Sequence, residues 1–162
     1  MIISNATPII NFGRAGVLDI LRACFDNIVI TKAVYHEIIE KKDSPETLAL
    51  KKVIDEGWVI IEDIEMNHLL KTESLGKGEK EAISLSKKKK IPLLIDDDSA
   101  KAYASVLGIE SHGSFYVLYL ACVKKIIDKN KAKEIFEGMI RNGFYVSIEL
   151  YSRFLGLLEE IP

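Results

Sequence analysis

The sequence is poor in cysteine, proline and tryptophan, and it has no large excess of charge of either sign. Of its 162 residues, two are cysteine, four are proline and one is tryptophan. Cys24 and Cys122 lie too far apart for a disulfide framework or a zinc-ligand spacing, so we expect small buried side chains in a reducing compartment. The formal net charge of −2 argues against a protein that coats polyanions with its whole surface, although it leaves room for a local basic patch.

Long apolar runs are also missing. No stretch reaches the ~18 residues of a membrane helix, and the N-terminus lacks the basic and apolar segments of an export signal. We therefore expect a cytoplasmic protein that makes no use of a membrane. Hydrophobic residues still form 48% of the chain, which is enough for one sizeable core. We expect a single domain over residues 1–162, with C-terminal helices at about 129–159 that pack on it or serve oligomerisation.

Predicted strands and helices alternate along most of the chain. Short apolar runs predict strands near residues 1–4, 27–30, 58–61 and 91–95. Capped or amphipathic segments predict the helices between and after them, the first with Thr7 as its N-cap and Pro8 at its first position. This alternation predicts an α/β fold, a three-layer α/β/α sandwich with a mostly parallel central sheet.

The apolar run at 91–95 ends at three consecutive carboxylates, Asp96, Asp97 and Asp98. Ligand-binding groups of α/β sheets gather just beyond the carboxyl ends of the strands. Three adjacent anions repel one another, and a bound Mg²⁺ or Mn²⁺ is the most economical way to offset that repulsion. As an alternative, the triplet caps the following helix, with Asp98 or Ser99 accepting the first amide hydrogens.

Three other places carry polar residues that this architecture would bring to the same edge. Asn5 ends the first strand, Glu37 lies in the helix after the second strand, and Glu79 and Glu81 open a helix after Gly78. Together with the aspartates they would form an oxygen-rich cage suited to metal-assisted phosphodiester hydrolysis. Each of these residues also has a structural alternative. Asn5 could be a helix-entry residue, Glu37 a solvated helix position, and Glu79 and Glu81 acids at the positive end of a helix dipole. Only one of the two glutamates at 79 and 81 can face the site, because they lie two positions apart.

The order of these segments resembles the PIN-domain family, and most closely its prokaryotic branch called domain of unknown function 3368. The matching segments are 2–12, 33–38, 78–83, 94–97, 108–113 and 143–151, so the resemblance covers nearly the whole chain. It implies a ribonuclease that depends on Mg²⁺ or Mn²⁺, with RNA as its substrate. The best-known relatives are toxins of toxin–antitoxin pairs, which adds a small antitoxin protein and a homodimer to the expected partners.

Carried over position by position, the acidic residues of the family fall on Asn5, Glu37, Glu81 and Asp97, with Asp96 adjacent. The resemblance therefore implies Glu37, Glu81 and Asp97 as catalytic residues. It implies Asn5, Asp96 and Asp97 as the metal ligands.

One position departs from the family pattern, because the family has an aspartate where this chain has Asn5. An amide oxygen can ligate a hard cation but brings no charge, which weakens metal binding and electrostatic stabilisation of the transition state. Two functions therefore stay open: a metal-dependent endoribonuclease, or a weakened or inactive PIN-fold protein that acts by binding RNA or protein. Lys101 is the candidate nucleic-acid contact, since it follows Asp97 by four residues on the next helix. A phosphatase of the haloacid-dehalogenase type is disfavoured, because only 64 residues follow Asp98.

Overall fold

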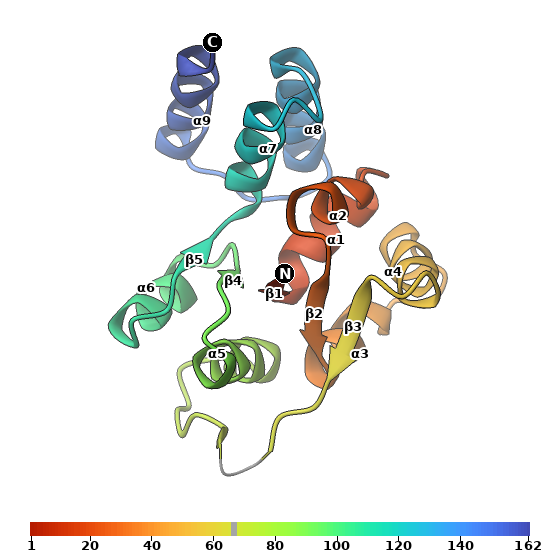
Figure 1. The fold of residues 1–162 in the computed structure, drawn as a ribbon, viewed down its shortest axis with the longest axis vertical. Helices are drawn as coiled ribbons and strands as arrows, with labels where there is room; N and C mark the ends of the chain where they lie inside the picture. The colour runs from red at the N-terminus through yellow and green to blue at the C-terminus, as the bar shows by residue number, and fades with distance from the viewer. Residues whose placement is uncertain (66–67) are drawn as a thin grey trace.

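The computed structural model describes residues 1–65 and 68–162, and its centre is a five-stranded parallel sheet in the order β3-β2-β1-β4-β5 (Figure 1). The strands are β1 Ile2–Ser4, β2 Ile28–Thr31, β3 Val59–Glu62, β4 Leu93–Leu94 and β5 Ser111–His112. Every strand pair in the sheet is parallel. The sheet with helices around it confirms the predicted α/β/α fold.

Nine helices accompany the sheet within the described residues. They are α1 Ala6–Arg14, α2 Asp19–Phe25, α3 Lys32–Ile39, α4 Pro45–Asp55, α5 Lys77–Lys89, α6 Asp98–Val106, α7 Ser114–Val123, α8 Lys129–Arg141 and α9 Ile148–Glu160. Several begin at capping side chains: the hydroxyls of Thr31, Ser44 and Ser147 each accept a hydrogen bond from the amide three residues on. No helix among the described residues is long and apolar enough to cross a bilayer.

One prediction about secondary structure was wrong, and one strand was not predicted. The first helix begins at Ala6, so Asn5 and not Thr7 is the N-cap, and Pro8 lies at the third helical position. Proline is tolerated there because the first-turn amides have no partner inside the helix. The strand β5 was not predicted, since two polar residues carry no strand signal of their own. It forms because the chain pairs alongside β4.

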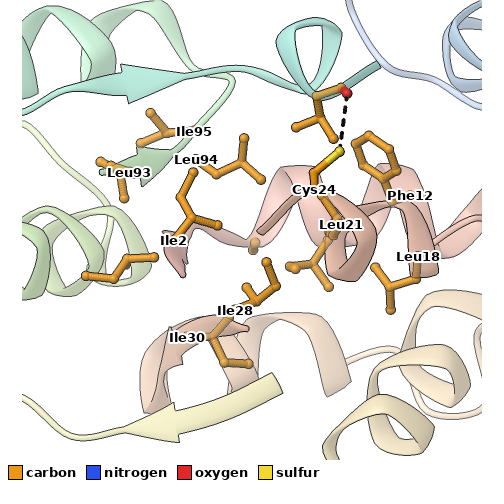
Figure 2. Packing of buried hydrophobic residues seen from close by; sticks show 14 of the residues in the cluster. Ile2, Phe12, Leu18, Leu21, Cys24, Ile28, Ile30, Leu93, Leu94 and Ile95 are labelled. Carbon is orange, nitrogen blue, oxygen red and sulfur yellow. Dashed lines mark hydrogen bonds between the residues drawn. The ribbon is translucent and has the colours of Figure 1, made fainter. Parts of the chain in front are cut away.

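The core is a single cluster of buried side chains that reaches from the sheet to the C-terminal helices. In Figure 2, Ile2 of β1 and Leu94 of β4 lie close to Cys24 and Leu21 of α2. Both cysteines are buried, as predicted. The Cys24 thiol faces the carbonyl oxygen of Val117 at 3.8 Å (Figure 2). Burial raises the pKa of this thiol to about 11, although the nearby Lys124 acts in the opposite direction.

The last two helices pack on the same core. The rings of Phe136 in α8 and Phe154 in α9 lie with their centroids 4.4 Å apart, and both side chains are fully buried. Figure 1 shows α7, α8 and α9 side by side at one end of the long axis, with α5 towards the other end. A role of these helices in oligomerisation stays a prediction.

The parallel pairing places three segments side by side at the carboxyl edge of the sheet. The amide of Asn5 donates to the carbonyl of Leu94 at 2.9 Å, and the amide of Ile95 donates to the carbonyl of His112 at 2.8 Å. Asn5, Asp96 and Gly113 therefore follow three neighbouring strands. This edge is where the candidate site lies.

Candidate functional site

Asn5 has a buried side chain whose oxygen lacks a partner. The residue is 4% exposed, and among the described residues its Oδ1 is the one buried side-chain polar atom without a hydrogen bond. Asn5 is the N-cap of α1, yet its side chain makes no capping hydrogen bond. A buried acceptor without a donor costs about 1–3 kcal/mol. Such an atom calls for a ligand that the protein itself does not supply.

Glu37 of α3 faces the same point in space as Asn5. A Cβ atom placed on Gly78 would lie 2.7 Å from Glu37 Oε2 and 3.5 Å from Asn5 Oδ1. The two oxygens therefore converge on the α5 backbone from two other elements, the end of β1 and the helix α3. Any side chain at position 78 would fill the space between these two oxygens. The arrangement therefore requires a glycine at this position.

Acidic side chains crowd this part of the molecule. Asn5, Glu37 and Glu79 line a cleft of about 560 Å³ together with Gly76 and Gly78. Partial burial, followed by the charges of Glu79 and Glu40, raises the pKa of Glu37 above its ordinary value. A cation in the cleft would relieve both effects, since it would replace lost hydration and offset the repulsion.

Glu81, which the resemblance placed in the site, makes a different contact. Its Oε2 accepts a hydrogen bond of 3.1 Å from the backbone amide of Ala33, near the start of α3. The carboxylate therefore joins α5 to the N-terminus of α3, where a negative charge is favourable. Glu79 lines the cleft instead, and its Oε2 also accepts from the Gly76 amide at 2.9 Å. Of the two glutamates, Glu79 is the one beside Asn5 and Glu37.

Asp96 is held by donors from two other elements. Its Oδ1 accepts from the Ser114 amide at 2.7 Å, and its Oδ2 accepts from the Ser114 hydroxyl at 2.6 Å and from Asn11 Nδ2 at 3.4 Å. Burial raises the pKa of Asp96, while these hydrogen bonds and the charge of Lys101 act in the opposite direction. The carboxylate thus ties β4 to α1 and to the start of α7.

Asp97 and Asp98 differ from Asp96 and from each other. Asp97 is the N-cap of α6, and its Oδ1 accepts from the Ala100 amide at 2.8 Å. Its other oxygen makes no hydrogen bond found among the described residues, and the residue is exposed. The side chain of Asp98 is 100% exposed. The expectation that Asp98 or Ser99 caps this helix was therefore wrong, because the backbone turns into the helix one residue earlier.

Lys101 lies over the start of α7. A Cβ atom on Gly113 would be 3.0 Å from Lys101 Nζ and 3.0 Å from Asp96 Oδ1. The ammonium group is also 4.0 Å from Asp98 Oδ1. Its first partners are thus carboxylates at the end of β4, and a contact of Lys101 with nucleic acid stays a prediction.

Two residues that bind Asp96 were not singled out from the sequence. Asn11 is a buried amide between the apolar residues Ile10 and Phe12 of α1, and Ser114 is fully buried at the start of α7. The one available signal was Asn11 itself, because a polar residue on an apolar helix face needs a partner. The sequence does not show which partner that is.

The donor set around Asn5 fits a hard divalent cation. It consists of oxygen atoms only, which is what Mg²⁺ and Mn²⁺ prefer, and one of them is an orphaned acceptor. Within residues 1–65 and 68–162, however, no three His, Cys, Asp or Glu side chains converge as a ready metal cluster. Apart from Glu81, the residues predicted to form one cage line two neighbouring clefts that share Thr7, and a single cage around one cation stays a prediction. One cleft contains Asn5 and Glu37, and the other contains Asp96.

The Asp96 contacts predict a large structural role for this carboxylate. We expect Asp96→Ala to lower the free energy of unfolding by about 2–4 kcal/mol, because the Ser114 amide and hydroxyl and the Asn11 amide would lose a buried partner. Urea unfolding followed by circular dichroism measures the loss. Asp98→Ala is the matched control next but one in the chain, and it should change stability far less. Equal losses in the two variants would contradict this account of Asp96.

Comparison with known families agrees with this architecture. Residues 1–160 match the family model DUF3368, described as a PIN domain. Among curated proteins, none matches this chain. Among solved structures, the chain is similar to a PilT N-terminus domain protein from the hyperthermophilic archaeon Sulfolobus solfataricus P2. The two share 22% sequence identity and a TM-score of 0.54 over 72% of this chain and 90% of the archaeal one, which supports the fold. Since one family model spans almost the entire sequence, this chain belongs to the PIN-domain family.

Proposed function

We propose that this protein is a divalent-metal-dependent endoribonuclease that hydrolyses RNA phosphodiester bonds. PIN-domain proteins generally include metal-dependent nucleases, and the family typically uses divalent ions. The observation that carries the proposal is the orphaned Asn5 oxygen, which faces Glu37 across Gly78. A buried acceptor beside a carboxylate suits a cation better than it suits any side chain nearby.

In this proposal Asn5 and Glu37 hold the cation, and Glu79 adds negative charge from the same cleft. A bound Mg²⁺ or Mn²⁺ would polarise the phosphodiester and make a nucleophilic hydroxide accessible at neutral pH. Asp97 offers its free carboxylate oxygen from the neighbouring strand end, either to the cation or to the attacking water. Asp96 has an indirect role in this proposal. Its hydrogen bonds to Asn11 of α1 and Ser114 of α7 hold these two helices in place around the site.

Finer proposals follow from the family alone. The protein would act in the cytoplasm as the toxin of a toxin–antitoxin pair, with a small antitoxin protein that binds it. It would form a homodimer, for which the C-terminal helices are candidates. Lys101 would contact the RNA backbone once substrate competes with its carboxylate partners.

The close approach at Gly78 predicts a variant that damages the site and spares the fold. In Gly78→Ala, the new Cβ would push Glu37 away from Asn5, because Glu37 Oε2 lies 2.7 Å from that position and ends a flexible side chain. We expect the affinity for Mn²⁺ to fall about tenfold or more in calorimetric titration, with an almost unchanged melting temperature. Gly76→Ala in the same turn is the control, since its nearest atom is 3.6 Å away. If both variants bind Mn²⁺ as the wild type does, the cation is held elsewhere.

Cleavage of single-stranded RNA tests the proposed activity. With Mg²⁺ or Mn²⁺ present, Glu37→Gln should lower the rate by ~100-fold, the scale on which a charge that stabilises the transition state matters. Asp97→Asn should also lower it, and this change isolates the charge because asparagine caps a helix as well as aspartate does. Asp98→Asn, at a fully exposed carboxylate, should cleave like the wild type. Cleavage that survives both Glu37→Gln and Asp97→Asn would point to a contaminant or another site.

A second function is favoured by Asn5 itself. The neutral amide lowers the charge of the site, so the alternative is a catalytically weakened PIN-fold protein that acts by binding RNA or protein. Asn5→Asp separates the two readings, because it adds the missing charge without changing the shape of the side chain. A wild type that cleaves RNA, with a gain on Asn5→Asp, supports the ribonuclease. A silent wild type that only Asn5→Asp activates supports the weakened protein.

A further inference from the structure

A second and larger cleft adjoins the proposed metal site. It has a volume of about 800 Å³ and is lined by residues of α1, of the segment 96–101 and of the segment 143–153. Thr7 lines both this cleft and the one that contains Asn5 and Glu37. The two clefts are therefore neighbours across the start of α1, with Asp97 on the wall of the larger one.

The rim of this second cleft carries one strongly exposed aromatic side chain. Tyr145 is 88% exposed and lies in the connection between α8 and α9. Tyr145 takes part in none of the aromatic pairs found among the described residues. A single exposed apolar residue is ordinary, but an exposed aromatic ring in the lining of a polar cleft offers a flat face on which a base can stack.

Cationic side chains lie inside the same cleft. Arg14 donates from Nε and Nη2 to the buried carboxylate of Glu46, at 3.1 Å and 2.9 Å, and this pairing fixes the guanidinium at the cleft wall. Its Nη1 makes no hydrogen bond found in the part of the chain that the structure describes. Arg153 of α9 lies 6.0 Å from the centroid of the Phe115 ring, which orients its guanidinium beside the cleft. The cleft lining also holds four carboxylates, those of Asp96, Asp97, Asp98 and Glu149. Arg153 and the exposed Tyr145 belong to the segment 143–153 of the same lining, and an arginine combined with an exposed aromatic ring is typical of a surface that binds single-stranded nucleic acid.

We propose that this cleft is a substrate subsite that holds the RNA strand next to the scissile phosphate, with one base stacked on Tyr145 and the backbone beside Arg14 and Arg153. The proposal rests on the RNA substrate proposed above, but it does not require that the site be catalytically active. Support for RNA as the occupant comes from the 143–153 side of the cleft, away from the carboxylates of residues 96–98, because the Arg153 guanidinium matches a phosphate and the exposed Tyr145 ring matches the face of any base. The position of the cleft supports it as well, since Thr7 lines both this cleft and the one that contains Asn5 and Glu37. Tyr145 would thus determine how the strand is placed.

Equilibrium binding without divalent metal tests this subsite apart from catalysis. The full-length protein is titrated into a fluorescein-labelled single-stranded RNA of twelve nucleotides in EDTA, and fluorescence anisotropy is recorded. Tyr145→Ala should weaken binding about tenfold or more, as the loss of one base–aromatic stack does, and Tyr145→Phe should restore it. Arg153→Ala should weaken binding and reduce the dependence of log affinity on log salt by about one unit.

Two controls make the test specific. Val106→Ala removes an apolar side chain that is 86% exposed on α6 but lies outside the cleft lining. Arg141→Ala removes a cation from α8 that is also outside it. Both should bind RNA as the wild type does. The subsite is overturned if the wild type does not bind RNA in EDTA, or if Tyr145→Ala binds as tightly as Val106→Ala. Binding that depends on Tyr145 without any cleavage would uphold the subsite and reject the ribonuclease.

Discussion

The close approach of α5 to the end of β1 is the constraint on which the site depends. It occurs at Gly78, where the absence of a side chain leaves room for Glu37 Oε2 and Asn5 Oδ1 to face the same point. The parallel sheet fixes the position of Asn5, because the Asn5 backbone amide donates a hydrogen bond to the carbonyl of Leu94 at the end of β4. The orphaned oxygen is thus a product of rigid surroundings. A flexible loop would let it turn towards water.

The three consecutive aspartates have identical side chains but different surroundings, and therefore different roles. Asp96 lies two residues after the end of β4, and Ser114 and Asn11 donate hydrogen bonds to it. Asp97 is the N-cap of α6, and its second carboxylate oxygen has no hydrogen bond within residues 1–65 and 68–162, whereas the Asp98 side chain is exposed to solvent. Mutual repulsion is therefore relieved in two ways: the fold spreads the three charges over different environments, and Lys101 lies close to two of them. A bound cation is not required to explain the triplet, but it is suggested by Asn5 and Glu37.

The fold and its elements were largely predictable from the sequence, because apolar runs and caps act locally. The shift of the first N-cap from Thr7 to Asn5 and the strand β5 were missed, since both depend on pairing with β4. The same limit applies to the site. Chain order predicts that Asn5, Glu37 and Asp96 lie at one sheet edge, but only side-chain packing decides that Asp96 binds Ser114. It also decides that Glu81 caps α3 while Glu79 lines the cleft.

The central claim is that Asn5 and Glu37 hold a divalent cation although one of them is neutral. A crystal of the protein grown with Mn²⁺ and measured near the manganese absorption edge tests this directly. The account predicts an anomalous peak within ~2.5 Å of both Asn5 Oδ1 and a Glu37 carboxylate oxygen. A peak confined to Asp96–Asp98, or an Asn5 side chain that is satisfied by protein donors with no peak beside it, would contradict it.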